Sequence, residues 1–419
     1  MKTLSQPCIE NQDIKHGREV ELLLCCARTC LSPSTVERTK VLLEQDIDWE
    51  YLLKTAYCHK VLPLLALNLM KYPQAVPVDT LERLRQYYYI NAQHNLTLGS
   101  KLIQLLDIFE KNGISVIPFK GPVLAACIYG DIARREFGDL DFLVHREDFL
   151  KTKELLTARG YQPYASSNEK EASYLRSLTL QQQEAYLRSH WELHLVNQRD
   201  RVTIDVHQGI LPKQFSFLYN TEWMWKDTQL ISFTSRQILS FSPEDLILVL
   251  CSQGGKDSWQ WLNRICDLAE VIRACRDVNW EKIWERASKL RMRRMLLLGL
   301  SLAHELLDAV LPEIMIEKIK ADPSIKVFSL QVSLQLFNQA ENSVTNYKFK
   351  NLFFHLKLIE HPIDKVGYCY EHMIVPTVAD KAFLRLPKFF SFLYYLLRPI
   401  RLITMYLLSQ LGNLLINFH

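Results

Sequence analysis

The sequence predicts an α+β fold that is predominantly helical, and three observations support this class. Apolar residues recur every three or four positions from residue 20 to about residue 106, as in amphipathic helices. The same spacing returns after residue 242. Between these parts, short apolar runs alternate with polar residues, as in strands. We therefore expect a helical region at 1–109, an α/β core with a small mixed sheet at 110–240, a helical domain at 241–340 and a helical tail at 341–419.

The N-terminal region is predicted to be all helical. Leucines at positions 62, 65 and 69, and again at 102, 105 and 106, would lie on one face of a helix. Residues 1–18 are polar and lack the apolar core of a secretion signal. We therefore expect no export and a cytoplasmic protein.

The α/β core begins with a closely spaced set of elements. Residues 114–117 read as a strand, 120–122 as a Lys-Gly-Pro turn and 123–129 as a helix, with proline near its first turn. A second strand is predicted at 139–144. A turn that leads into a helix beside a polar strand is a place where a polyphosphate would bind.

Two carboxylates share one face of the strand at 139–144. Side chains alternate along a strand, so Asp139 and Asp141 point the same way, about 7 Å apart along the backbone. Such a pair can hold a hard cation. Two solvated acids on an edge strand are the alternative interpretation, since Asp-x-Asp is a common sequence.

Two further strands follow, at 191–196 and 202–207, joined by a turn at 197–200. In the second of them Thr203, Asp205 and His207 lie on the polar face. Asp205 is therefore a candidate third carboxylate. His207, like His194 in the preceding strand, is more often a structural hydrogen-bonding residue than a metal ligand.

Helices complete the core and open the next region. Residues 148–159 read as a helix that ends at Gly160, and 166–188 as a helical insertion. Ser242 caps a helix that begins with Pro243.

These elements resemble a known group of enzymes. A strand, a glycine turn, a helix, Asp-x-Asp and a later single Asp are similar to the nucleotidyltransferase superfamily typified by DNA polymerase beta. The particular residues of its motifs resemble those of an uncharacterised bacterial nucleotidyltransferase family whose turn carries Lys-Gly. The motifs are Phe119-Lys120-Gly121, Arg135-x-x-Gly138-Asp139-Leu140-Asp141, Gly160-Tyr161, Ile204-Asp205-Val206-His207, Pro243-Glu244-Asp245-Leu246, Gly254-Gly255-Lys256, Arg264-Ile265-Cys266-Asp267 and the tail at 384–401.

The resemblance implies a sheet of the nucleotidyltransferase type and a metal-dependent reaction. A nucleoside monophosphate would move from a nucleoside triphosphate to a hydroxyl group, with release of pyrophosphate. Mg²⁺ or Mn²⁺ would be bound by the catalytic residues Asp139, Asp141 and Asp205. The acceptor, which would be a small molecule, a peptide or a protein, is not identified by the sequence.

The resemblance also implies which residues contact the nucleotide. Most of the superfamily has Gly-Ser in the turn, whereas this chain has Lys120 and Gly121, so Lys120 either replaces the serine hydroxyl or is a solvated surface residue. Arg135 either reaches a phosphate or balances the charge of the acids. Asp267 is a weaker candidate for nucleotide or acceptor contact. The remaining cofactor-binding candidates are Lys256 and Arg264.

Composition limits the partners. A formal net charge of +4 over 419 residues gives no electrostatic case for binding nucleic acid. The ten cysteines include no Cys-x-x-Cys pair, which suits a reducing compartment. The apolar tail at 389–418 is interrupted by Arg398, Pro399 and Arg401. We expect it to pack on the protein, with contact to a membrane interface as the alternative.

A different class of function is compatible with the same motifs. Because the turn lacks its serine, the fold could instead be a nucleotide-binding or partner-binding scaffold with little or no turnover.

Overall fold

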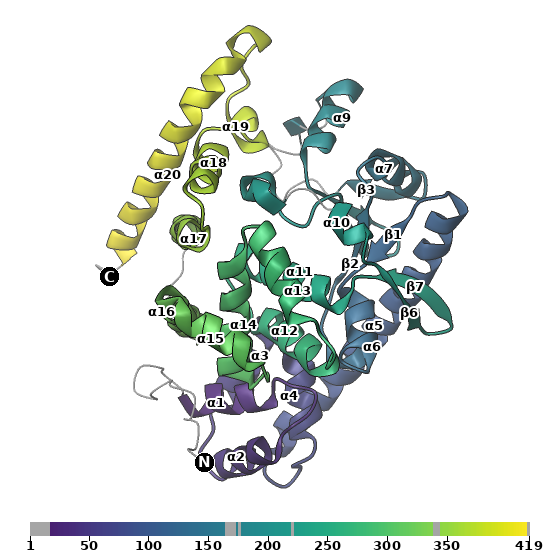
Figure 1. Cartoon of the computed structure of the whole chain (residues 1–419), viewed down its shortest axis with the longest axis vertical. Helices are drawn as coiled ribbons and strands as arrows, with labels where there is room; N and C mark the ends of the chain where they lie inside the picture. The colour runs from purple at the N-terminus through teal and green to yellow at the C-terminus, as the bar shows by residue number, and fades with distance from the viewer. Residues whose placement is uncertain (1–16, 164–172, 175–176, 219–221, 338–343, 417–419) are drawn as a thin grey trace. The chain divides into compact units, whose positions relative to one another are not determined.

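The structure is a computed structural model that describes residues 17–163, 173–174, 177–218, 222–337 and 344–416 (Figure 1). It divides into two compact units. The first comprises Met1–Asp141, Met224–Lys289 and Arg293–Gln339, and the second comprises Phe142–Trp223, Leu290–Met292 and Ala340–His419. The division falls inside one strand, between Asp141 and Phe142.

The first unit is mostly helical, and its core is formed by α11, α12 and α14. Eleven residues of α14 are buried, because leucines surround this helix on nearly every side. The α12 helix buries ten of its thirteen residues. The helices of this unit are α1 (Gly17–Cys26), α2 (Pro33–Leu43), α3 (Trp49–Cys58), α4 (Leu62–Leu69), α5 (Val78–Lys111), α6 (Gly121–Cys127), α11 (Pro243–Lys256), α12 (Leu262–Ala274), α13 (Trp280–Lys289), α14 (Arg293–Leu307), α15 (Glu313–Ala321) and α16 (Pro323–Phe337).

Two glycines allow a tryptophan to enter this core. A Cβ atom at Gly254 would lie 2.5 Å from the Trp259 ring, and one at Gly299 would lie 2.8 Å from it. Trp259 is fully buried. The glycines on α11 and α14 are therefore required by close packing, which gives a structural reason for the first glycine of the Gly-Gly-Lys motif.

The main sheet has five strands in the order β1-β2-β5-β4-β3. The β3–β4 and β4–β5 pairs are antiparallel, and the second places His194 opposite Asp205 and Glu192 opposite His207. A separate antiparallel hairpin is formed by β6 (Gln229–Phe233) and β7 (Arg236–Ser240). The strands of the main sheet are β1 (Val116–Pro118), β2 (Asp139–Val144), β3 (Tyr161–Pro163), β4 (Glu192–Asn197) and β5 (Val202–His207).

The second unit ends in a layer of helices. The long α20 (Tyr394–Ile416) contacts α17 (Val344–Leu358), α18 (Pro362–Met373) and α19 (Val378–Phe383), as Figure 1 shows at the yellow end of the chain. Two short helical stretches, α7 (Phe149–Thr157) and α9 (Leu180–Ser189), lie nearer the strands in sequence. Of the described helices, none combines the length and the apolar character needed to cross a membrane.

The predicted fold class is confirmed, because the chain is mainly helical and has one small mixed sheet. The strands at 139–144 and 202–207 have the predicted bounds, and the other predicted strands are displaced by one or two residues. Ser242 accepts a hydrogen bond from the backbone of Asp245, so it is the predicted helix cap. The helix predicted at 148–159 ends at Thr157, two residues earlier than predicted, and Gly160 lies in the turn that follows it with φ +88°. The predicted insertion at 166–188 contains α9, but 164–172 and 175–176 lie outside the described residues. The four-part domain division stays a prediction.

Candidate active site

A tight turn brings Lys120 and Gly121 against the start of β2. Lys120 has φ +72°, a region that favours glycine, and Gly121 has φ +43°. A Cβ atom at Gly121 would lie 3.2 Å from the backbone oxygen of Asp139. The Phe119 amide donates a hydrogen bond to the backbone oxygen of Asp141 at 3.2 Å. The glycine of the Lys-Gly motif therefore allows the turn to pack directly on the strand of the two aspartates.

The Lys120 side chain lies over that strand. Its Nζ atom is 3.8 Å from Oδ1 of Asp141, and both side chains are nearly buried. Burial lowers the pKa of the Lys120 ammonium, and the carboxylate of Asp141 opposes this effect. The positive charges of Arg264 and Lys256 lower it further. Three of the predicted phosphate-binding cations thus act on one another in the first unit.

Lys256 and Arg264 are held by an acid that the sequence analysis missed. Asp257 lies 3.3 Å from Lys256 Nζ and 3.3 Å from Arg264 Nη2. It directly follows the Gly-Gly-Lys motif at the end of α11, and that adjacency was the available signal. The pairing orients two cations from neighbouring helices.

Arg135 and Asp267, in contrast, form a buried pair away from solvent. The Nε and Nη2 atoms of Arg135 donate to the two carboxylate oxygens of Asp267 at 2.7 and 2.8 Å. The Tyr129 hydroxyl donates to the same carboxylate at 2.7 Å. Side-chain amides of Asn91 and Asn95 hold the backbone oxygen of Arg135. This geometry favours a role in fixing the loop before β2, and contact of Arg135 with nucleotide stays a prediction.

The third predicted aspartate is paired within the second unit. Nδ1 of His194 lies 2.7 Å from Oδ1 of Asp205, and Nε2 of His194 lies 3.3 Å from Glu192. The hydrogen bond to Asp205, and then that to Glu192, raises the pKa of His194 to about 10. The imidazolium therefore neutralises Asp205 in this structure.

Neighbouring strands bring two of the three predicted aspartates together. Asp141 is on β2, and Asp205 is on β5, the next strand of the sheet. One ligand atom from each of Asp141, Asp205 and His207 lies within 4.8 Å of the other two. Two carboxylate oxygens and an imidazole nitrogen suit a divalent cation, and Mn²⁺ accepts such a mixed set. The sequence favoured a structural role for His207, and that role stays a prediction. Its place on the polar face of β5 with Asp205 makes it a candidate ligand as well.

Asp139 acts on the same charges without being one of these three ligands. Its carboxylate raises the pKa of Lys120, though less than burial lowers it. Asp139 is the first residue of β2, and its backbone oxygen faces Gly121 of the Lys-Gly turn. The catalytic and metal-binding roles of Asp139, Asp141 and Asp205 stay predictions.

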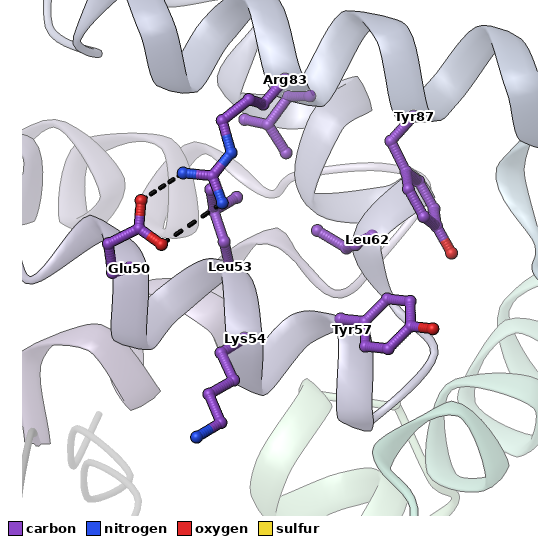
Figure 2. A pocket seen from close by; sticks show the side chains of 8 residues that line it. Glu50, Leu53, Lys54, Tyr57, Leu62, Arg83 and Tyr87 are labelled. Atoms are coloured by element: carbon purple, nitrogen blue, oxygen red, sulfur yellow. Dashed lines mark hydrogen bonds and ion pairs between the residues drawn. The ribbon is translucent and has the colours of Figure 1, made fainter.

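One pocket in the first unit borders this region. It has a volume of about 340 Å³ and is lined by Gly138, the residue before Asp139, and by Tyr87, Asn91, His94 and Glu136 among others. Tyr87 also lines a second pocket, shown in Figure 2, where Glu50 and Arg83 form an ion pair above Leu53 and Leu62. The second pocket contains none of the predicted site residues.

Comparison with known families places these residues in context. The sequence model of an uncharacterised nucleotidyltransferase family matches residues 45–308, which include the Lys-Gly turn and all three aspartates. The chain belongs to this family. The tail at 384–401 lies beyond the matched residues. Comparisons with curated proteins and with solved structures gave no significant match.

Proposed function

We propose that the protein is a metal-dependent nucleotidyltransferase that transfers a nucleoside monophosphate from a nucleoside triphosphate to a hydroxyl group of an acceptor. The observation that carries the proposal is the packing of the Lys-Gly turn on β2, which sets the Lys120 ammonium over Asp141. Family membership supports the reaction class.

Three cations would bind the triphosphate. Lys120 is close to Asp141 and has few exposed atoms, so its ammonium is already desolvated and oriented. Phosphate oxygens entering beside it would accept its hydrogen bonds. Lys256 and Arg264, which are held by Asp257, would contact the remaining phosphate oxygens.

The acids would hold the metal and the acceptor. The carboxylates of Asp141 and Asp205 would fit Mg²⁺ or Mn²⁺, the nitrogen of His207 would favour Mn²⁺, and Asp139 would bind on the triphosphate side. A divalent cation bound there supplies neutralisation of the phosphate charge and of the pyrophosphate leaving group. Asp205 would accept the hydroxyl proton, while His194 orients its carboxylate.

In the proposed reaction the acceptor hydroxyl attacks the α-phosphorus of the triphosphate. The acceptor oxygen forms a bond to the α-phosphorus, and the bond between the α-phosphorus and its bridging oxygen breaks. Pyrophosphate leaves with the bonding electron pair, and the hydroxyl proton goes to Asp205. The pocket lined by Gly138 and Tyr87 is the proposed place for the acceptor, because Gly138 directly precedes Asp139 in the chain. We propose that the acceptor is a small molecule, a peptide or a protein and is not nucleic acid.

A labelling experiment tests this function. Purified protein is incubated with each nucleoside triphosphate carrying an α-phosphorus label, with Mg²⁺ or Mn²⁺, alone and with cell extract. The wild type and the Asp79→Asn control should transfer label and release pyrophosphate, since Asp79 is an exposed acid on α5. Asp139→Asn and Asp141→Asn should not. Equal transfer by all four proteins would exclude the proposed site.

A second candidate function is supported by the charge pairing itself. Asp141 is paired with Lys120, and Asp205 with His194, so both carboxylates are neutralised within the chain. A nucleotide-binding or partner-binding scaffold would need no more than this. Binding of triphosphate without transfer of label, under every metal and extract tested, would favour the scaffold.

A further inference from the structure

Helix α20 turns its apolar face outward. The side chains of Leu396, Ile400, Ile403 and Leu407 are 63%, 61%, 53% and 55% exposed. Their spacing of four, three and four residues places them on one face of the helix. An ordinary surface helix would bury such a face.

The opposite face of α20 contains two arginines that form ion pairs within the protein. Arg398 is buried, and its Nη1 atom lies 2.7 Å from Asp380 of α19. Arg401, one turn further along, places Nε 2.8 Å from the same carboxylate. Arg398 also donates to the backbone oxygen of His372 at 3.1 Å. Rotating α20 to bury its leucines would break these ion pairs and leave Asp380 buried without them, so the outward orientation is fixed.

Aromatic side chains extend the exposed apolar surface toward the start of α20. Phe383, Phe389 and Phe392 are 68%, 83% and 58% exposed. The Tyr394 hydroxyl accepts from the Leu386 amide at 2.8 Å and donates to the Leu384 oxygen at 2.7 Å. These bonds fix the turn that presents the phenylalanines. We call the exposed apolar side chains of residues 383–407 the apolar stripe.

The charge of this segment identifies the kind of partner. Apart from the two arginines paired with Asp380, residues 381–419 contain three basic residues, Lys381, Arg385 and Lys388, and no acidic residue. Arg385 is exposed beside the stripe. Basic residues beside exposed leucine and phenylalanine are typical of helices that lie in the interface of an anionic bilayer. A second copy would bring the same positive charge against itself, which disfavours a dimer through this face.

We propose that the apolar stripe docks on an anionic lipid surface, with α20 parallel to the membrane plane. The leucine and phenylalanine side chains enter the boundary between headgroups and acyl chains, and Arg385 and Lys381 meet the lipid phosphates. This inference is independent of the proposed nucleotidyl transfer. It adds a membrane contact to the packing that the sequence suggested, because the face of the helix that carries Tyr394 and the two arginines packs on the protein and another apolar face stays open.

Vesicle flotation of the full-length chain tests the proposal. The protein is mixed with vesicles of phosphatidylcholine alone or of phosphatidylcholine with phosphatidylglycerol, at low and high salt. The wild type should bind the mixed vesicles, and more weakly at high salt. The triple variant L396Q/I400Q/I403Q should bind these vesicles at least about tenfold more weakly.

The matched control changes exposed apolar residues elsewhere. V310Q/V327Q/L330Q removes side chains that are 83%, 62% and 51% exposed in the first unit, and it should bind as the wild type does. Arg385→Glu should weaken binding only to the vesicles with phosphatidylglycerol, and it serves as the second variant if the triple variant does not fold.

Three results would overturn the proposal. The first is the absence of wild-type binding to the mixed vesicles. The second is equal binding by wild type, triple variant and Arg385→Glu. The third is a wild-type dimer in sedimentation velocity that L396Q/I400Q/I403Q converts to a monomer without any vesicle binding, which would assign the stripe to a second copy of the chain.

Discussion

The ammonium of Lys120 lies 3.8 Å from the Asp141 carboxylate, on a backbone with φ +72° that glycine would adopt at lower cost. Such a conformation costs a non-glycine residue about 1–3 kcal/mol. The chain keeps a lysine where glycine would be more stable. A charge that is retained against conformational strain is typical of a functional residue.

Two substitutions separate the charge of Lys120 from its strain. Lys120→Ala and Lys120→Gly both remove the ammonium, so both should lower kcat/KM for nucleotidyl transfer about 100-fold. Only glycine relieves the strain, so Lys120→Gly should be more stable than Lys120→Ala by about 1 kcal/mol. Urea denaturation and the label-transfer assay measure the two effects. Full activity in either variant would contradict the phosphate-binding role.

We expect substitution of Arg135 to lower the stability of the protein before it affects catalysis directly. Arg135→Ala would leave the fully buried Asp267 carboxylate without its bidentate partner, which should destabilise the protein by about 3–5 kcal/mol. Thermal denaturation measures this loss. If Arg135→Ala instead melts at the same temperature as the wild type but no longer binds triphosphate, the result would support the nucleotide contact predicted from the sequence.

The sequence was sufficient for features that depend on neighbouring residues. The bounds of β2 and β5 follow from alternation over six residues, and Gly160 located the end of α7 to within two residues. Partners far apart in the chain left no such pattern. Asp267 follows Arg135 by 132 residues, and no sequence pattern near either residue indicates that the two form an ion pair. The sequence therefore shows which residues carry charge, but it does not predict which of them form ion pairs with one another.

The tail shows the same limit. The sequence of α20 indicates an apolar helix interrupted by arginines, but it does not predict which face of the helix packs on the protein. That depends on Asp380, whose carboxylate is held by two arginines from α20. The ligand cluster is similar: strand alternation put Asp205 and His207 on one face, whereas their approach to Asp141 depends on strand order.

Substitution of Gly254 should expose the tight packing of Trp259. The new methyl group of Gly254→Ala would lie 2.5 Å from ring atoms, so the ring must move within a filled core. We expect a loss of about 1–3 kcal/mol in the free energy of unfolding. Gly367→Ala is the matched control, because nothing lies within 4 Å of its added carbon. In α18 the alanine should be neutral or stabilising. Equal stability of the two variants would show that the core yields.

His59 should make the first unit sensitive to acid. Its Nδ1 accepts from the Leu262 amide at 3.3 Å, so Nε2 carries the hydrogen that is donated to the Leu336 oxygen at 3.0 Å. A proton on Nδ1 would face the Leu262 N–H. Burial lowers the pKa of His59 to about 4 from 6.5. Between these pH values the unfolded chain binds more protons than the folded one, so stability is lost as the pH falls.

A glutamine variant tests this contribution. His59→Gln keeps a donor and an acceptor but cannot titrate. From pH 7 to pH 4 the wild type should lose about 3 kcal/mol more stability than the variant does, since each pKa unit corresponds to about 1.4 kcal/mol. Urea midpoints measured across this range give the difference, and other titrating groups cancel in it. Parallel profiles for the two proteins would mean that His59 is protonated in the folded state, with its contact to Leu262 lost.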